Sequence, residues 1–284
     1  MFAIAKRNIF LYFRDKTAVF FSLLAVLILI ALYVFFLGEM TSTGLPDFPA
    51  KKPLLTAWFI AGILAVTSMT STLGALGVLV DDRFLKIDMD FNSSPISKPQ
   101  LVGGYITSSM FVGILMCSFT FIVAAIYLSL SGGTILSFGN TVQVFGVIIL
   151  SVVANGSMVL FLVSSLKTSN AFAGASMVIG TFIGFLAGIY IPIGSLPEYL
   201  QTIVKVFPVS HSVSLFRQIL MESSLLEAFS NAPAELKKDF LINMGVSYEI
   251  KDKLTTKLFS VLYLIGTAVL FFSCTLVVLM KKKS

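Results

Sequence analysis

Residues 189–217 read IYIPIGSLPEYLQTIVKVFPVSHSVSLFR, and this stretch decides how the rest of the chain is interpreted. Pro192, Pro197 and Pro208 divide it into two short, mostly apolar pieces. A helix of about ten to twelve residues is roughly 15–18 Å long, whereas a hydrocarbon core of about 30 Å needs close to twenty residues. The pieces are too short to cross a membrane and too apolar for water. They predict a re-entrant hairpin that turns back at Pro208; a hairpin lying on the membrane surface is the alternative.

The composition excludes a soluble domain. The chain is 57% hydrophobic and 12% charged, and it contains several uncharged runs long enough to span a bilayer. Cys117 and Cys274 both lie inside apolar runs, so we interpret them as packed side chains and not as disulfide or metal ligands. We therefore expect no catalytic, cofactor-binding or metal-binding residue in this chain.

The predicted fold class is an all-α membrane protein with six transmembrane helices, an N-terminal interfacial helix and a re-entrant helical hairpin between the fifth and sixth spans. The spans are expected at about 17–37, 57–80, 104–130, 141–166, 171–191 and 258–280. A single domain covers 1–284, with the interfacial helix at 1–16, a cytoplasmic loop at 81–103, the outward hairpin at 192–221 and a small external cap at 222–257.

The distribution of charge orients these spans. The N-terminal flank, the loop at 81–103, Lys167 and the C-terminal lysines carry eleven basic and five acidic residues, whereas the other side carries nine of each. The positive-inside rule then places both termini in the cytoplasm of a cell membrane, and bacterial cells are the expected source. Because topology explains the basic excess, no nucleic-acid partner is implied; the lipid bilayer is the expected partner.

The predicted spans contain no Asp, Glu, Lys, Arg or His. Ion-coupled carriers and selective pores usually place ionisable groups there, so this absence argues against both classes. Gly180, Gly184 and Gly188 recur at four-residue spacing in the fifth span, which is typical of a face where helices pack closely. Asn155 in the fourth span is expected to form a hydrogen bond between helices.

The loop at 81–103 is the second informative stretch. A short helix over 83–91 would present Phe84, Ile87 and Phe91 along one side. Apolar side chains on a charged cytoplasmic loop suggest a docking surface for a partner. Burial of these side chains against the protein's own helix ends is the alternative.

Two sequence motifs in these stretches give the chain a family resemblance. The first motif follows the second span and comprises Asp82-Arg83, Ser94-Pro95-Ile96-Ser97 and Leu101-Val102-Gly103-Gly104. The second follows the fifth span and comprises Ile191-Pro192-Ile193, Leu196-Pro197, Phe207-Pro208 and Arg217. With these motifs in this order, the chain resembles the membrane subunit, or permease, of ABC exporters of the type-2 permease family. The family often has Glu-Arg-Glu and Gly-Thr before its Ser-Pro, and this loop departs from that pattern.

The resemblance implies a transport subunit and not an enzyme. The chain has no Gly-x-x-x-x-Gly-Lys-(Ser/Thr) motif, so ATP and Mg²⁺ would bind to a separate ABC ATPase subunit. A second copy of the chain or a homologous permease would complete the path. The residues expected to dock the ATPase are Arg83, Phe84, Ile87, Phe91, Lys167 and Thr168. The residues expected to form the external gate are Pro192, Pro197, Phe207, Pro208 and Arg217.

The substrate class stays open at this stage. The uncharged spans favour export of a hydrophobic or amphipathic compound, such as a drug, an antibiotic or an antimicrobial peptide. Export of a lipid-linked glycan or of sodium is the alternative within the same family. A membrane immunity or sensor protein that does not transport, and a passive pore or secondary carrier, are the alternatives from other classes.

Overall fold

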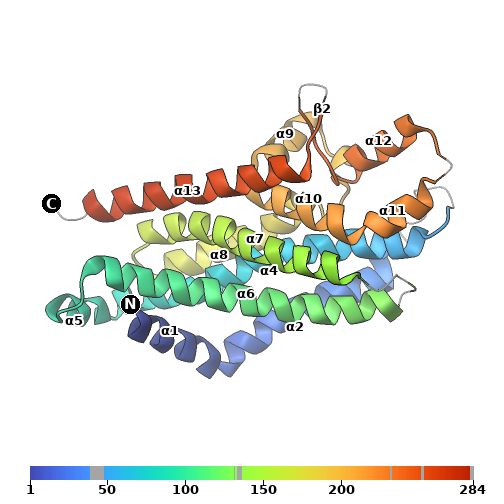
Figure 1. The fold of residues 1–284 in the computed structure, drawn as a ribbon. Helices are drawn as coiled ribbons and strands as arrows, with labels where there is room; N and C mark the ends of the chain where they lie inside the picture. Colours follow the sequence, from blue (N-terminus) through green and yellow to red (C-terminus); the bar gives the residue numbers. More distant parts are fainter. Residues whose placement is uncertain (39–47, 131, 133–135, 231, 251–252, 282–284) are drawn as a thin grey trace.

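The structure is a computed structural model that describes residues 1–38, 48–130, 132, 136–230, 232–250 and 253–281. Long helices run side by side along one axis, and shorter elements gather at one end of this bundle (Figure 1). The described elements are α1 (Phe2–Arg14), α2 (Lys16–Leu32), the π-helix η1 (Tyr33–Leu37), α4 (Lys51–Phe84), α5 (Ile87–Ser93), α6 (Lys98–Leu130), α7 (Phe138–Ser165), α8 (Ser169–Leu186), the 3₁₀ turn η2 (Ile193–Ser195), α9 (Glu198–Val206), α10 (Pro208–Leu220), α11 (Glu222–Ala228), α12 (Ala234–Asn243), β1 (Glu249–Ile250), β2 (Lys253–Leu254) and α13 (Lys257–Lys281).

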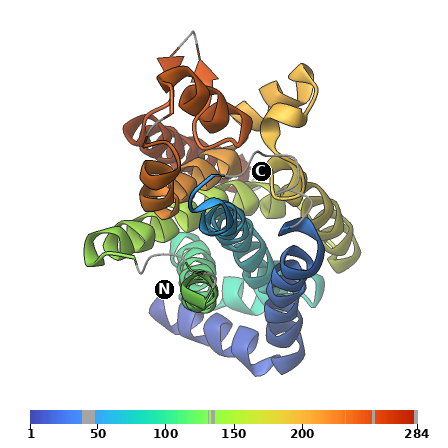
Figure 2. The ribbon, with the colours of Figure 1, turned by 90° about the vertical axis from the view of Figure 1, so that its right-hand side faces the viewer.

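Helix α4 forms the centre of the bundle. It contacts α6, α7, α8 and α10, and Figure 2 shows it surrounded by other helices when the bundle is seen end-on. Every residue from 54 to 69 is buried, because this part of α4 is apolar or small on all sides. The hydrophobic core therefore follows the axis of α4 through most of the molecule.

The structure shows an all-α membrane protein, to which a single pair of two-residue strands, β1 and β2, is added. Five of the described helices are long and apolar enough to cross a membrane, namely α4, α6, α7, α8 and α13. They correspond to the second to sixth predicted spans. The first predicted span, 17–37, is occupied by α2 and η1, whose apolar part, Ser22–Phe36, is shorter than the other five. The sixth crossing and the re-entrant hairpin thus stay predictions.

The fifth predicted span, 171–191, was extended too far. Helix α8 ends at Leu186, and the next residues turn through Gly188, which has a φ of +60°. Only glycine adopts this left-handed conformation without steric cost, so it is a common way to end a helix. The short helix predicted over 83–91 is present as α5, but its predicted bounds were wrong. Helix α4 continues to Phe84, and α5 starts only after Lys86, which has a φ of +61°.

The two short pieces of the predicted hairpin are the helices α9 and α10. Helix α10 is buried almost throughout and lies between α4, α7 and the first turns of α13. The ring of His211 in α10 stacks on Tyr263 in α13 with 3.9 Å between their centroids. Helices α11 and α12 and the β1–β2 pair lie at this end of the bundle and make up the segment for which a small external cap is predicted; we call these elements the cap (Figure 1).

Both ends of the described chain lie at the opposite end of the bundle, where α5 is also found (Figure 1). The N-terminal helix α1 packs against α6. A Cβ atom added at Gly104 would lie 2.7 Å from the side chain of Ile4, and one added at Gly103 would lie 2.9 Å from Met1. These two glycines of the first motif therefore leave the space that α1 needs to pack closely against α6.

Candidate functional site

The turn after α4 and the turn after α7 are joined by Arg83. Its guanidinium donates to the main-chain carbonyls at the C-terminal end of α7, at 3.4 Å for Val163, 3.2 Å for Ser164 and 3.3 Å for Leu166. Carbonyls in the last turn of a helix lack partners in the helix itself, so a guanidinium there satisfies them. Ser169 at the start of α8 donates to Asp81 at 2.9 Å. The structure thus brings together the predicted docking residues Arg83, Lys167 and Thr168.

The other predicted docking residues divide into exposed and partly buried groups. Phe84 is 58% exposed, and sequence reasoning missed its exposed neighbours Leu85 and Met89, the latter 62% exposed. Ile87 and Phe91 are half-buried. Thr168 caps α8 by accepting a hydrogen bond from the main-chain nitrogen of Ala171 at 3.2 Å. We name Phe84, Leu85 and Met89 the apolar knob of this end.

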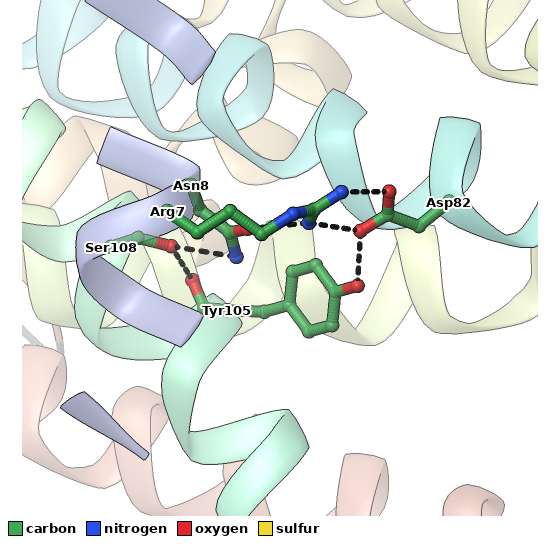
Figure 3. A network of polar contacts seen from close by, with 5 residues as sticks. All are labelled: Arg7, Asn8, Asp82, Tyr105 and Ser108. Carbon is green, nitrogen blue, oxygen red and sulfur yellow. Dashed lines mark hydrogen bonds and ion pairs between the residues drawn. The ribbon is translucent and has the colours of Figure 1, made fainter. Parts of the chain in front are cut away.

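An ion pair with a buried carboxylate lies directly beside this surface. Asp82 is 3% exposed, and Arg7 on α1 donates one hydrogen bond to each of its carboxylate oxygens, at 2.7 Å and 2.8 Å (Figure 3). The phenol of Tyr105 on α6 donates to the same carboxylate. The hydrogen bond with Asp82 is the largest of the effects that raise the pKa of Arg7 above its ordinary value, so the guanidinium stays charged. A fork-to-fork contact of this kind is the strongest geometry for such a pair.

Two further contacts extend this group, which we name the Arg7–Asp82–Tyr105 network. Arg7 donates to Asn8 at 2.9 Å, and Asn8 lies 3.5 Å from the hydroxyl of Ser108 on α6. The guanidinium of Arg7 also lies over the ring of Phe91 in α5, 5.4 Å from its centroid. Four elements, α1, α4, α5 and α6, therefore meet at one side chain.

A groove of about 1030 Å³ runs along α4 between α2 and α8. Its walls are mainly apolar, with hydroxyl groups and glycines between, and its charged residues lie towards the end that holds α5. The apolar lining includes Val26, Leu29, Leu32, Val66, Phe172 and Ile183; the hydroxyl groups belong to Ser22, Thr67 and Thr70; the charged lining is Arg7, Asp15, Asp81 and Asp82. A mostly apolar cavity with a few polar groups is the usual form of a site for a small or amphipathic molecule.

The predicted glycine face of α8 borders this groove. Gly180 has no atom within 4 Å of the place where a Cβ would lie, among the residues that the structure describes. A Cβ at Gly184 would lie 2.3 Å from the ring of Tyr190, and one at Gly188 would lie 2.8 Å from Ile193. Two of the three glycines therefore make room for the chain that follows α8, and Gly180 lines open space in the groove.

The residues predicted as an external gate lie around α9 and α10. Pro192 precedes η2, Pro197 precedes α9, and Pro208 is the first residue of α10 directly after half-buried Phe207. Each proline lies at the start of a helix, where a main-chain N–H group would have no partner in that helix, so its absence costs no hydrogen bond.

Arg217 in α10 is fully buried. Its guanidinium donates to the carbonyls of Met244 at 2.8 Å and Gly188 at 2.9 Å, and it lies 4.4 Å from the ring centroid of Trp58. Sequence reasoning placed Arg217 in the gate but missed that it joins the ends of α8 and α12 to α4.

Comparison with known proteins agrees with this architecture. The family model described as ABC-2 family transporter protein matches residues 54–277, which is most of the chain. A search of curated proteins finds no match. The matched part starts inside α4, so α1 and α2 lie outside it, whereas the groove wall on α4 and α8 and the buried Arg217 lie within it.

Proposed function

The chain belongs to the ABC-2 family of transporter proteins and is a multi-pass membrane subunit of an ABC transporter, and from this premise we propose that it exports a hydrophobic or amphipathic compound along the groove between α2, α4 and α8. The groove carries the proposal. Its apolar walls suit the apolar part of such a compound, and its charged end lies beside the α5 surface where a driving subunit would act.

The proposed driving subunit is a separate ABC ATPase. The apolar knob of Phe84, Leu85 and Met89 is exposed at the end of the bundle that holds both chain termini. Exposed apolar side chains grouped on a charged surface are typical of a protein interface. Arg83 fixes this knob to the turn between α7 and α8, so a push on either turn moves both.

We propose that a second permease closes the open side of the groove. Only 11% of the apolar window of α8 is buried, compared with 83% for α4. Met177, Val178 and Phe182 are exposed along α8, next to the open space at Gly180. A second copy or a homologous chain packed on Met177, Val178 and Phe182 would convert the groove into an enclosed path.

The proposed topology has six crossings with both termini in the cytoplasm. Helices α2 and η1 make the first crossing, and α9 and α10 dip into the outer leaflet and return. The burial of α10 among α4, α7 and α13 supports this arrangement, because irregular backbone is tolerated at membrane depth where protein surrounds it.

The function is tested by reconstituting the chain with an ABC ATPase in proteoliposomes. We expect ATP hydrolysis that rises with a transported amphipathic compound, and Phe84→Asp or Met89→Asp should remove both this rise and the co-purification of the ATPase. Leu236→Asp on the exposed face of α12 is the matched control. Flux that needs an ion gradient and no ATPase would overturn the proposal.

The topology is tested by labelling single cysteines in intact cells after Cys117 and Cys274 are replaced by Ser. Met89→Cys on α5 and Leu236→Cys on α12 are both exposed in the structure. A membrane-impermeant thiol reagent should label Leu236→Cys in whole cells and Met89→Cys only after the cells are broken. Labelling of both positions in whole cells would contradict the proposed topology.

A further inference from the structure

We propose that the Arg7–Asp82–Tyr105 network is the joint that carries displacement of α5 to α1 and α2, and through them to one wall of the groove. The inference rests on the proposed function, because it concerns how the same transporter is driven. Arg7 is a positioning residue in this role, since it acts through the helices that it holds together.

The first step of the argument is that α5 and α1 are connected at two points. Asp82 lies two residues before the end of α4, and α5 starts at Ile87, so the carboxylate moves with the first residues of α5. Phe91, near the other end of α5, lies under the guanidinium of Arg7. Arg7 therefore contacts Asp82 just before the start of the proposed docking helix, as Figure 3 shows, and Phe91 near the other end of that helix.

The second step is that α1 has one main attachment besides these contacts, its seat on α6. Gly103 and Gly104 let Met1 and Ile4 approach the backbone of α6, and Tyr105 and Ser108 on the next turn reach Asp82 and Asn8. The Arg7–Asp82–Tyr105 network and the close packing at Gly103 and Gly104 thus hold α1 to α4 and α6 at this end of the bundle.

The third step is that α1 continues into the groove wall. Only Asp15 separates α1 from α2, and Figure 1 shows the two helices meeting at an angle. Tyr12 of α1 and Ser22, Val26 and Leu29 of α2 all line the groove. Because a single residue joins the two helices, a displacement of α1 also moves α2 relative to α8.

The burial of Asp82 makes the joint strong. Removing Arg7 would leave a carboxylate that is only 4% exposed without its cation, which costs more than breaking an exposed pair. The two parallel hydrogen bonds also fix the angle between α1 and α4, which a single contact would not. The pair therefore keeps both the distance and the angle between α1 and α4 fixed when either helix moves.

The test measures the amount of compound transported per ATP hydrolysed in the reconstituted complex with its ATPase. Arg7→Gln should lower this ratio about tenfold, near the lower end of the range of coupling between sites. Arg7→Lys should lower it less, because it keeps the charge and loses the fork. Arg14→Gln removes the same charge from an exposed position on the same helix and should leave the ratio unchanged.

A rescue experiment separates the joint from general folding effects. In a background without native cysteines, Arg7→Cys and Asp82→Cys remove the ion pair and are then joined by a short bifunctional methanethiosulfonate reagent, which forms a reducible disulfide with each thiol and releases methanesulfinate. The cross-link should restore the ratio and a reductant should lower it again, because the covalent bond replaces the ion pair. A wild-type ratio in Arg7→Gln, or a lowered ratio that the cross-link leaves unchanged, would overturn the inference.

If Arg7→Gln fails to assemble, Tyr105→Phe weakens the same carboxylate contact with no change in charge and is measured in the same way. Hydrogen exchange of the α1 amides reports on the joint without transport, and it should be faster in either variant than in the wild type. Failure of the wild-type complex to transport would refute the proposed function, whereas unchanged exchange in α1 would refute the joint alone.

Discussion

Arg217 in α10 donates a hydrogen bond of 2.8 Å to the main-chain carbonyl of Met244, the residue that ends α12. The indole nitrogen of Trp58 donates to the same carbonyl at 2.7 Å. One carbonyl oxygen at the base of the cap thus accepts from the hairpin and from the central helix. This arrangement explains how α12 keeps a fixed position on the bundle.

Loss of Arg217 should destabilise the cap first. Arg217→Ala removes the donor of the Gly188 carbonyl and leaves the Met244 carbonyl with Trp58 alone. An unpaired buried carbonyl and the space left by a large buried side chain each cost about 1–3 kcal/mol, so we expect a loss of roughly 3 kcal/mol. Trp58 is the single tryptophan and is buried beside Arg217, so its fluorescence should shift to the red as the cap loosens. A variant with unchanged emission and thermal midpoint would show that the guanidinium is dispensable.

The turn at Gly245 should tolerate no side chain. Its φ is +62°, and a Cβ there would lie 2.4 Å from Ile193 and 2.9 Å from the guanidinium of Arg217. Gly245→Ala should lower the thermal midpoint by several degrees in detergent, since backbone strain and the steric clash add. Gly266→Ala in α13 is the control, because a Cβ there meets open space and alanine favours a helix by about 1 kcal/mol. An equal effect of the two substitutions would contradict the assigned geometry.

Asn155 connects three helices inside the bundle, which confirms the hydrogen bond predicted from the sequence. Its amide donates to Ser68 of α4 at 2.7 Å and to Ser212 of α10 at 3.4 Å. We expect Asn155→Ala and Ser68→Ala each to cost about 1 kcal/mol, and the double variant to cost less than their sum. A double-mutant cycle by thermal unfolding measures this coupling; strict additivity would mean that the two side chains do not interact.

Sequence reasoning succeeded where one local property decides the structure. The sequence predicted α7 and α13 to within three residues at each end, whereas α4 and α6 each start six residues before the predicted span. Long uncharged apolar runs are easy to place because they have no stable alternative to a buried or lipid-facing helix. The short helices α9 and α10 were expected because prolines mark their starts.

The misplaced features depend on contacts between distant parts of the chain. The end of α8 is set at Gly188, whose carbonyl is satisfied by Arg217, and the fifth run stays apolar beyond that point. Arg7 and Asp82 are 75 residues apart, and each resembles an ordinary cytoplasmic charge that sets topology. No pattern along the sequence indicates that these two charges form a pair.

Filling the groove should stop transport without disturbing assembly. Gly180 lines the groove and has open space around it, so Gly180→Phe places a ring in the path while leaving the folded chain intact. Gly146→Phe is the matched control, since Gly146 is exposed on α7, also has open space around it and lies outside the groove lining. We expect transport to fall on the order of tenfold in Gly180→Phe, equivalent to about 1.4 kcal/mol. The ATPase should co-purify equally with both variants, because the apolar knob of Phe84, Leu85 and Met89 lies at the far end of α4. Equal transport by the two variants would place the path of the compound elsewhere than along α8.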